Sequence, residues 1–222
     1  MKNKVLVIGA DHHNTLGIVE SLGQKGLNSY VLIVGENINS FVLKSRYVIE
    51  GWVCSSPEQV VDEMLKHFSD TKNKVIVYSS YDNVSSVLDS SVQRLSPFFI
   101  LPVTNMPGSL ERKMSKEYMS DLAREVGLDV PRTWMVSDRK VPADIEFPCI
   151  TKAISSVEGS KKNIKICKKR EELEEFLANS EHCPIIQIQK FIIKDFAFQF
   201  LGCSMDNGKH IIISGRTHID RP

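Results

Sequence analysis

The residues best suited to chemistry lie around Lys152. Lys152 ends an apolar segment that begins at Phe147. A lysine on a half-buried strand needs an anionic partner or a path to water. Residues 155–162, which follow, combine serine, glycine and lysine. Such a loop suits folding backbone N–H groups over phosphate, although ordinary hairpin loops share this composition. The pattern indicates a phosphate-binding lysine with a covering loop.

Polar side chains also follow two predicted strands in the first half of the chain. The residues are Asp11, His12, Asn14 and Asp82. Parallel α/β sheets bind small ligands at the carboxyl ends of their strands, which favours substrate contacts here. The alternatives are a plain turn for the first three residues and a helix N-cap for Asp82.

Metal and disulfide sites are not predicted. His12 and His13 are adjacent, so we expect their side chains to diverge, and no third ligand is apparent. The five cysteines are scattered and form no C-x-x-C pair, which favours a reducing cytosol.

Composition excludes several classes of protein. The 222 residues contain 28 Lys and Arg against 27 Asp and Glu, so the basic surface of a nucleic-acid binder is not expected. No apolar run approaches the length of a membrane span or a signal peptide core. We therefore expect a cytoplasmic protein without a membrane or nucleic-acid partner.

The first half of the chain alternates short apolar strands with amphipathic helices. The expected strands are 5–8, 29–34, 47–49, 74–78 and 98–101, with helices through 16–22, 57–68 and 83–95. This alternation predicts an α/β domain with an open, mainly parallel sheet.

The second half is β-rich. A helix is expected over 109–126, ended by Gly127, and a second over 169–178. Strands are expected at 130–134, around Lys152, and at 164–167, 184–192, 196–201 and 210–214. Because βα alternation stops, we divide the chain into domains 1–105 and 106–222.

The serial order of these parts resembles the ATP-grasp superfamily, in particular carboxylate–amine ligases similar to the carbamoyl-phosphate synthase large subunit and D-alanine–D-alanine ligase. The order is a helix with a lysine, a glycine, Val-Pro, a strand with a lysine, a Gly/Ser loop, a strand, a helix, an apolar strand and a polar hinge. The resemblance implies a Rossmann-like pre-ATP-grasp domain with a parallel sheet, followed by the α+β first part of an ATP-grasp domain.

The resemblance also implies a set of phosphate contacts. Lys116 matches a helix lysine, although Ser115 stands where the family has aspartate. Lys152 matches a strand lysine, with Ala153 in place of a proline. The phosphate-covering loop maps onto Ser156, Gly159 and Ser160.

The nucleoside contacts carry over in the same way. The hinge whose backbone reads adenine maps onto Gln189, Lys190, Phe191 and Ile192, with lysine at 190 where glutamate is common. Asp195 matches the acid that holds the ribose hydroxyls. Arg216 lies where a phosphate or substrate arginine is frequent.

The family's Mg²⁺ ligands, carboxylates followed by an asparagine, find no match before Pro222. We therefore expect them beyond residue 222 and interpret the chain as the N-terminal portion of a ligase, inactive alone, because phosphoryl transfer relies on the metal. The resemblance implies ATP and Mg²⁺ as cofactors, and a small carboxylate and an amine as substrates.

Two other functions remain open at this point. One is a non-catalytic nucleotide-binding module that regulates or binds a partner. The other is an NAD binder, which is poorly supported because G-x-G-x-x-G is absent. Apolar strands near the C-terminal end would favour self-association, as in a homodimer.

Overall fold

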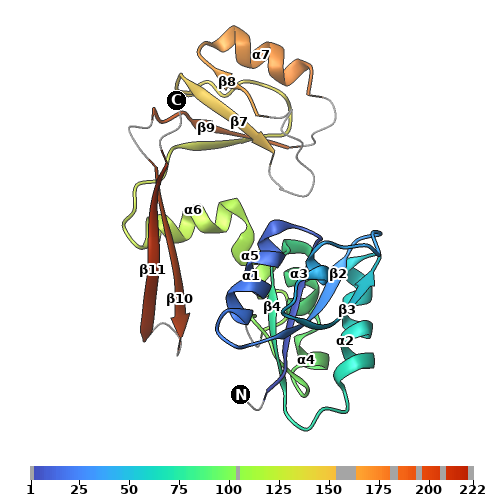
Figure 1. Cartoon of the computed structure of the whole chain (residues 1–222). Coiled ribbons are helices and arrows are strands. Elements are labelled where there is room, and N and C mark those ends of the chain that lie inside the picture. The colour runs from blue at the N-terminus through green and yellow to red at the C-terminus, as the bar shows by residue number, and fades with distance from the viewer. Residues whose placement is uncertain are drawn as a thin grey trace. The chain divides into compact units, whose positions relative to one another are not determined.

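The computed structural model describes residues 3–103, 106–153, 164–180, 185–193, 197–205 and 209–219. Its contacts divide the chain into two compact units, Met1–Leu122 and Ala123–Pro222 (Figure 1). The first unit holds a parallel sheet and the second an antiparallel one, which confirms the predicted change of fold class. The boundary at residue 105 stays a prediction.

The first unit is built on a five-stranded parallel sheet. Its strands are β1 (Val5–Gly9), β2 (Ser29–Val34), β3 (Val48–Cys54), β4 (Val75–Ser79) and β5 (Phe99–Ile100). They lie in the order β3-β2-β1-β4-β5. The expected strand 47–49 was too short, because pairing with β2 continues as far as Val34 and Cys54.

Helices cover both faces of this sheet. Helix α1 (His13–Gly23) and the short η1 (Val42–Lys44) pack on one face, and the buried core there includes Val7, Val19 and Val42. The other face carries η2 (Pro57–Gln59), α2 (Val60–Phe68), α3 (Asp82–Ser90) and α4 (Val92–Leu95) over a larger core. The sheet is thus enclosed from both sides, as a doubly wound fold requires.

Two helices expected to be continuous are each interrupted by a serine. The helix predicted at 83–95 divides at Ser91 into α3 and α4. The helix predicted at 109–126 divides into α5 (Ser109–Met114) and α6 (Lys116–Glu125). Ser115 between them is extended, and its Oγ accepts from the Tyr118 amide at 3.3 Å. A serine that caps a new helix ends the preceding one.

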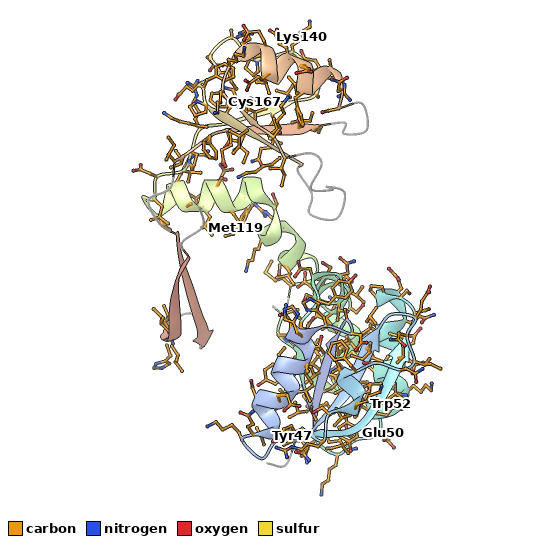
Figure 2. All side chains as sticks on the ribbon, turned by 45° about the horizontal axis from the view of Figure 1, so that its top comes forward. Tyr47, Glu50, Trp52, Met119, Lys140 and Cys167 are labelled. Atoms are coloured by element: carbon orange, nitrogen blue, oxygen red, sulfur yellow. The ribbon has the colours of Figure 1, made fainter. Side chains whose placement is uncertain are left out.

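The second unit contains a four-stranded antiparallel sheet in the order β6-β9-β7-β8. The strands are β6 (Thr133–Val136), β7 (Cys149–Ala153), β8 (Ile166–Cys167) and β9 (Ile186–Lys190). Helix α7 (Arg170–Ala178) packs on one face over a core that includes Cys149, Cys167 and Leu173 (Figure 2).

A separate hairpin follows in the second unit. It pairs β10 (Ala197–Met205) with β11 (His210–Ile219) in antiparallel register. Both strands are longer than expected, because a register shift between Leu201 and Gly202 lets the pairing continue. Three consecutive isoleucines of β11, Ile211, Ile212 and Ile213, are exposed.

Candidate functional site

Lys152 lies on the face of the four-stranded sheet opposite α7. Along β7, Cys149 and Thr151 are fully buried, whereas Ile150 and Lys152 are only partly buried. Side chains alternate between faces along a strand, so Ile150 and Lys152 share one face. The same alternation in the paired strands adds Thr133, Met135, Gln187 and Gln189. We call these six residues the open face, although Gln187 itself is buried.

Hydrogen bonds connect three strands across the open face. Lys152 Nζ donates to Gln189 Oε1 at 2.8 Å, and Gln189 Nε2 donates to Thr133 Oγ1 at 3.2 Å. The Thr133 hydroxyl donates in turn to the Pro131 carbonyl at 3.0 Å. The ammonium group is therefore held in a defined position by a neutral amide. This arrangement suits the binding of an anion.

The predicted hinge begins at the end of β9. The Lys190 amide donates to the Arg132 carbonyl, and the Phe191 amide donates to the Pro148 carbonyl, both at 2.9 Å. No hydrogen bond joins the Ile192 amide to another residue in the part of the chain that the structure describes. Ile192 is also exposed. A backbone donor is thus available one residue after a firmly held segment.

Charged side chains hold the start of the hinge. Lys190 Nζ lies 2.6 Å from Glu146 Oε2, and Arg132 Nη1 lies 3.5 Å from Glu146 Oε1. The hydrogen bond from Lys190 lowers the pKa of Glu146. Arg132 also pairs with Asp144, which accepts from Trp134 Nε1 at 3.2 Å. Lysine at 190 is thus accommodated by an acid on another segment.

Several predicted site residues are described only in part or not at all. Lys116 is the first residue of α6, and Arg216 lies in β11 opposite Phe200. The remaining four, Ser156, Gly159, Ser160 and Asp195, lie outside the described residues. The roles given to these six residues stay predictions.

In the first unit, Asp11 has a structural role. Its carboxylate accepts from the Ser40 hydroxyl at 2.5 Å and from the Phe41 and Val42 amides at 3.3 Å each. It therefore fastens the turn after β1 to the start of η1. A substrate contact by the same carboxylate stays a prediction.

The other three predicted substrate residues occupy helix starts. His12 is the N-cap of α1, and its Nδ1 accepts from the Asn14 amide at 3.3 Å. The rings of His12 and His13 lie 3.7 Å apart, so our expectation that they diverge was wrong. Tyr81, and not Asp82, is the N-cap of α3. Asp82 is in the first turn, where a carboxylate favours the positive end of the helix.

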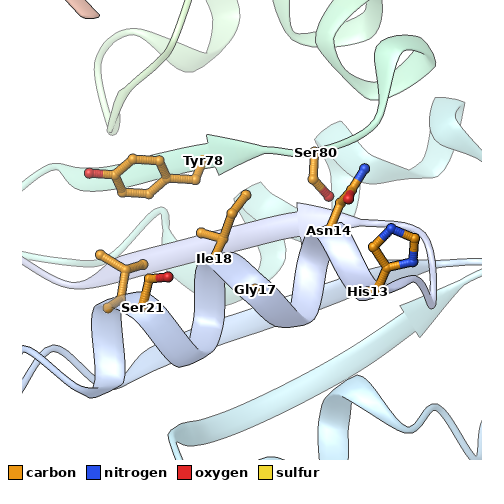
Figure 3. A pocket seen from close by; sticks show the side chains of 8 residues that line it. His13, Asn14, Gly17, Ile18, Ser21, Tyr78 and Ser80 are labelled. Atoms are coloured by element: carbon orange, nitrogen blue, oxygen red, sulfur yellow. The ribbon is translucent and has the colours of Figure 1, made fainter. Parts of the chain in front are cut away.

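An open groove of about 680 Å³ runs along α1 beside β4. Its lining is His13, Asn14, Gly17, Ile18, Ser21, Leu22, Tyr78 and Ser80. Figure 3 shows the Tyr78 ring across from Ile18 and Ser21, with Asn14 and Ser80 at the other end. The lining contains no Asp, Glu, Lys or Arg. Of the predicted substrate residues, the groove includes only Asn14.

Sequence reasoning missed Thr133 and Glu146. Thr133 lies two residues after Pro131 and directly before Trp134, which packs against the core, so alternation along the strand places Thr133 on the open face. Glu146 carries no such signal, because its partner Lys190 is distant in the sequence and on another segment.

No group of three or more His, Cys, Asp and Glu among the described residues could hold a metal ion. Within those residues, no helix is both long and apolar enough to cross a membrane.

Solved structures share this fold. An L-amino acid ligase from Bacillus licheniformis matches 98% of the chain with a TM-score of 0.70 and 16% identity. N5-carboxyaminoimidazole synthetase from Staphylococcus aureus matches 99% with a TM-score of 0.72 and 9% identity. The biotin carboxylase domain of Hydrogenobacter thermophilus 2-oxoglutarate carboxylase, in complex with MgADP, ADP and bicarbonate, matches 96% with a TM-score of 0.66 and 13% identity.

The chain spans about half the length of these structures: 51%, 55% and 49% in turn. No family model matches the sequence, and no curated protein is significantly similar to it. The structural neighbours belong to the ATP-grasp superfamily. The chain therefore has the fold of the N-terminal half of an ATP-grasp enzyme, which confirms the predicted resemblance at the level of fold.

Proposed function

We propose that this chain is the nucleotide-binding portion of an ATP-dependent carboxylate–amine ligase. The observation that carries the proposal is the setting of Lys152. Its ammonium is fixed 2.8 Å from Gln189 Oε1 on the open face. It lies directly before the serine- and glycine-rich segment 155–162 and on the same sheet as the hinge.

The described residues suit the parts of a nucleotide. Lys152 would bind phosphate by charge. Met135 and Ile150 supply apolar surface on the open face. The backbone amide of Ile192, an exposed residue, would donate to the edge of the base. Six further contacts are part of the proposal only through the resemblance to the family. They are those of Lys116, Ser156, Gly159, Ser160, Asp195 and Arg216.

The proposed reaction has two steps. A substrate carboxylate oxygen attacks the γ-phosphorus of ATP, forming an acyl phosphate and releasing ADP. An amine then attacks the acyl carbon, phosphate leaves, and the nitrogen loses a proton as the C–N bond forms. Lys152 would offset the negative charge that the phosphoryl oxygens carry in the first step.

Mg²⁺ is the metal that the fold implies. It prefers carboxylate and phosphate oxygens. Among the described residues, no group of three or more His, Cys, Asp and Glu could hold the ion. We assign no ligand and derive no step through the metal.

Thermal unfolding with ATP, ADP or NAD tests the proposal. A ligand at a hundred times its Kd adds about 2.7 kcal/mol to the free energy of unfolding. For a chain of this size the midpoint would rise by roughly 5 to 10 °C. We expect a shift with ATP or ADP that Lys152→Ala reduces and that Lys140→Ala, at an exposed position of the same unit, preserves. A shift with NAD alone would contradict the proposal.

A further inference from the structure

We infer that Gln189 and Thr133 are positioning residues that aim Lys152 at the nucleotide phosphates. The inference rests on the proposed function, and it assigns the two side chains a task separate from reading the base. Gln189 was predicted only as part of a hinge that uses its backbone, and Thr133 was not predicted at all.

The hydrogen bonds fix the direction of each group. The Thr133 hydroxyl has one proton, which it donates to the Pro131 carbonyl. Its oxygen, Oγ1, therefore acts as the acceptor for Gln189 Nε2. That contact turns Gln189 Oε1 toward Lys152 Nζ. If the Gln189 amide were flipped, its N–H groups would face the Lys152 ammonium. Two donors would then oppose each other, which is unfavourable. The network is therefore consistent in only one amide orientation.

Sheet register makes this network rigid. Thr133 and Gln189 are direct partners between β6 and β9. Lys152 is the direct partner of Gln187, and it reaches Gln189 diagonally on the same face. The three side chains thus come from three adjacent strands. Sites built on strands hold their geometry better than sites on loops.

The partner of Lys152, the Gln189 side chain, is a neutral amide, and this neutrality matters for anion binding. A carboxylate at position 189 would also accept from Lys152, but it would cancel the lysine charge and repel a phosphate. Glutamine holds the ammonium without adding negative charge. In this partly buried setting charges are weakly screened, so an anion that approaches Lys152 meets no added negative charge from position 189.

The first experiment measures binding of ATP and of adenosine to the full chain by titration calorimetry and ligand-observed NMR. A carboxylate at position 189 would add a negative charge beside Lys152 and repel phosphate, so Gln189→Glu should weaken ATP binding about tenfold. Thr133→Val should weaken ATP binding several-fold, and Thr133→Ser, which keeps the hydroxyl, should bind ATP as the unaltered chain does. None of these changes should reduce adenosine affinity to the same extent, because adenosine has no phosphate. A purely structural role would weaken both ligands together.

Controls separate this inference from the proposed function. Thr71→Val removes a similar part-buried hydroxyl that donates to the Phe68 carbonyl in the first unit, and it should leave ATP binding unchanged. If the unaltered chain fails to bind ATP, the proposed function fails. If ATP binds and Lys152→Ala weakens it, while Gln189→Glu and Thr133→Val bind normally, only the positioning inference is overturned. Should Thr133→Val fail to fold, Gln189→Glu decides, since it keeps the hydrogen bond to Lys152.

Discussion

Lys190 Nζ lies 2.6 Å from Glu146 Oε2, so an ion pair ties the last residue of β9 to the segment leading into β7. The same carboxyl faces Arg132 at 3.5 Å, and the Arg132 carbonyl accepts from the Lys190 amide at 2.9 Å. Three segments therefore meet where the hinge begins, which holds the backbone of Phe191 and Ile192 in place.

Glu146→Gln should loosen the hinge without unfolding the unit. We expect faster hydrogen exchange at the Phe191 amide and several-fold weaker adenosine binding, because the charge that holds Lys190 is lost. Glu174→Gln is the matched control, since Glu174 pairs with Arg170 in another exposed ion pair. Unchanged exchange and binding in Glu146→Gln would show that the pair has no influence on the hinge.

Acid should reproduce the effect of Glu146→Gln. The hydrogen bond from Lys190 lowers the pKa of Glu146 below its ordinary value of 4.5. A depressed folded pKa gives stability that is present above the unfolded pKa and lost as pH falls through the folded pKa. The Phe191 amide should thus stay protected at neutral pH and lose protection only below about pH 4.5. If the Phe191 amide lost protection between pH 6 and 7, a group other than Glu146 would be responsible for the pH dependence.

Two glycines should respond oppositely to alanine. A Cβ at Gly17 would meet nothing within 4 Å, so Gly17→Ala should stabilise α1 by about 1 kcal/mol through helix propensity. A Cβ at Gly9 would lie 2.1 Å from Ser80 Oγ and 2.4 Å from Thr15 Oγ1. Gly9→Ala should therefore destabilise by about 1 to 3 kcal/mol. Urea unfolding measures both, and equal effects would contradict the close approach at Gly9.

Asp89 should be needed as an acceptor and not as a charge. It is 1% exposed, and its Oδ2 accepts from the Leu110 amide of α5 at 2.8 Å. Within the described residues its Oδ1 has no hydrogen-bond partner. Asp89→Ala should cost about 1 to 3 kcal/mol, because the part-buried Leu110 amide loses its acceptor. Asp89→Asn keeps an acceptor oxygen and should cost less. If the two variants lost stability equally in chemical denaturation, the charge itself would be required.

Alkaline pH should destabilise the second unit through Cys149. Burial raises the pKa of this thiol from 9.0 to about 11. The unfolded chain then releases its proton before the folded chain does, so stability is complete below pH 9 and falls as pH rises toward 11. One such thiol contributes at most about 1.4 kcal/mol per pH unit. Cys149→Ala should flatten the decline in urea midpoints between pH 8.5 and 10.5, and an unchanged slope would exclude this thiol.

Much of the fold could be predicted from local patterns. The uninterrupted apolar run at Val5–Ile8 indicated a strand buried on both faces, and β1 is fully buried. The helical spacing at 57–68 corresponds to η2 and α2. Boundaries were less predictable. Ser115 and Ser91 divide helices because a capping or non-helical serine competes with helix continuation, and apolar spacing does not report this.

Only part of the candidate site could be predicted from the sequence. Lys152 was identified because a charged residue at the end of an apolar strand is unusual, and this holds whatever the strand pairs with. Its partner Gln189 is 37 residues away, and Thr133 is 56 residues from Gln189. No local pattern connects them.

The sequence by itself determined the kinds of elements, their order, and which strand carries the lysine, because the periodicity of apolar residues is a local property. Only the tertiary structure decided which side chains meet. Strand order β6-β9-β7 and its register bring Thr133, Gln189 and Lys152 onto one face. They also bring Lys190 to Glu146. A shift of one residue in that register would move the side chains of a whole strand to the other face, so pairing between distant segments fixes the site.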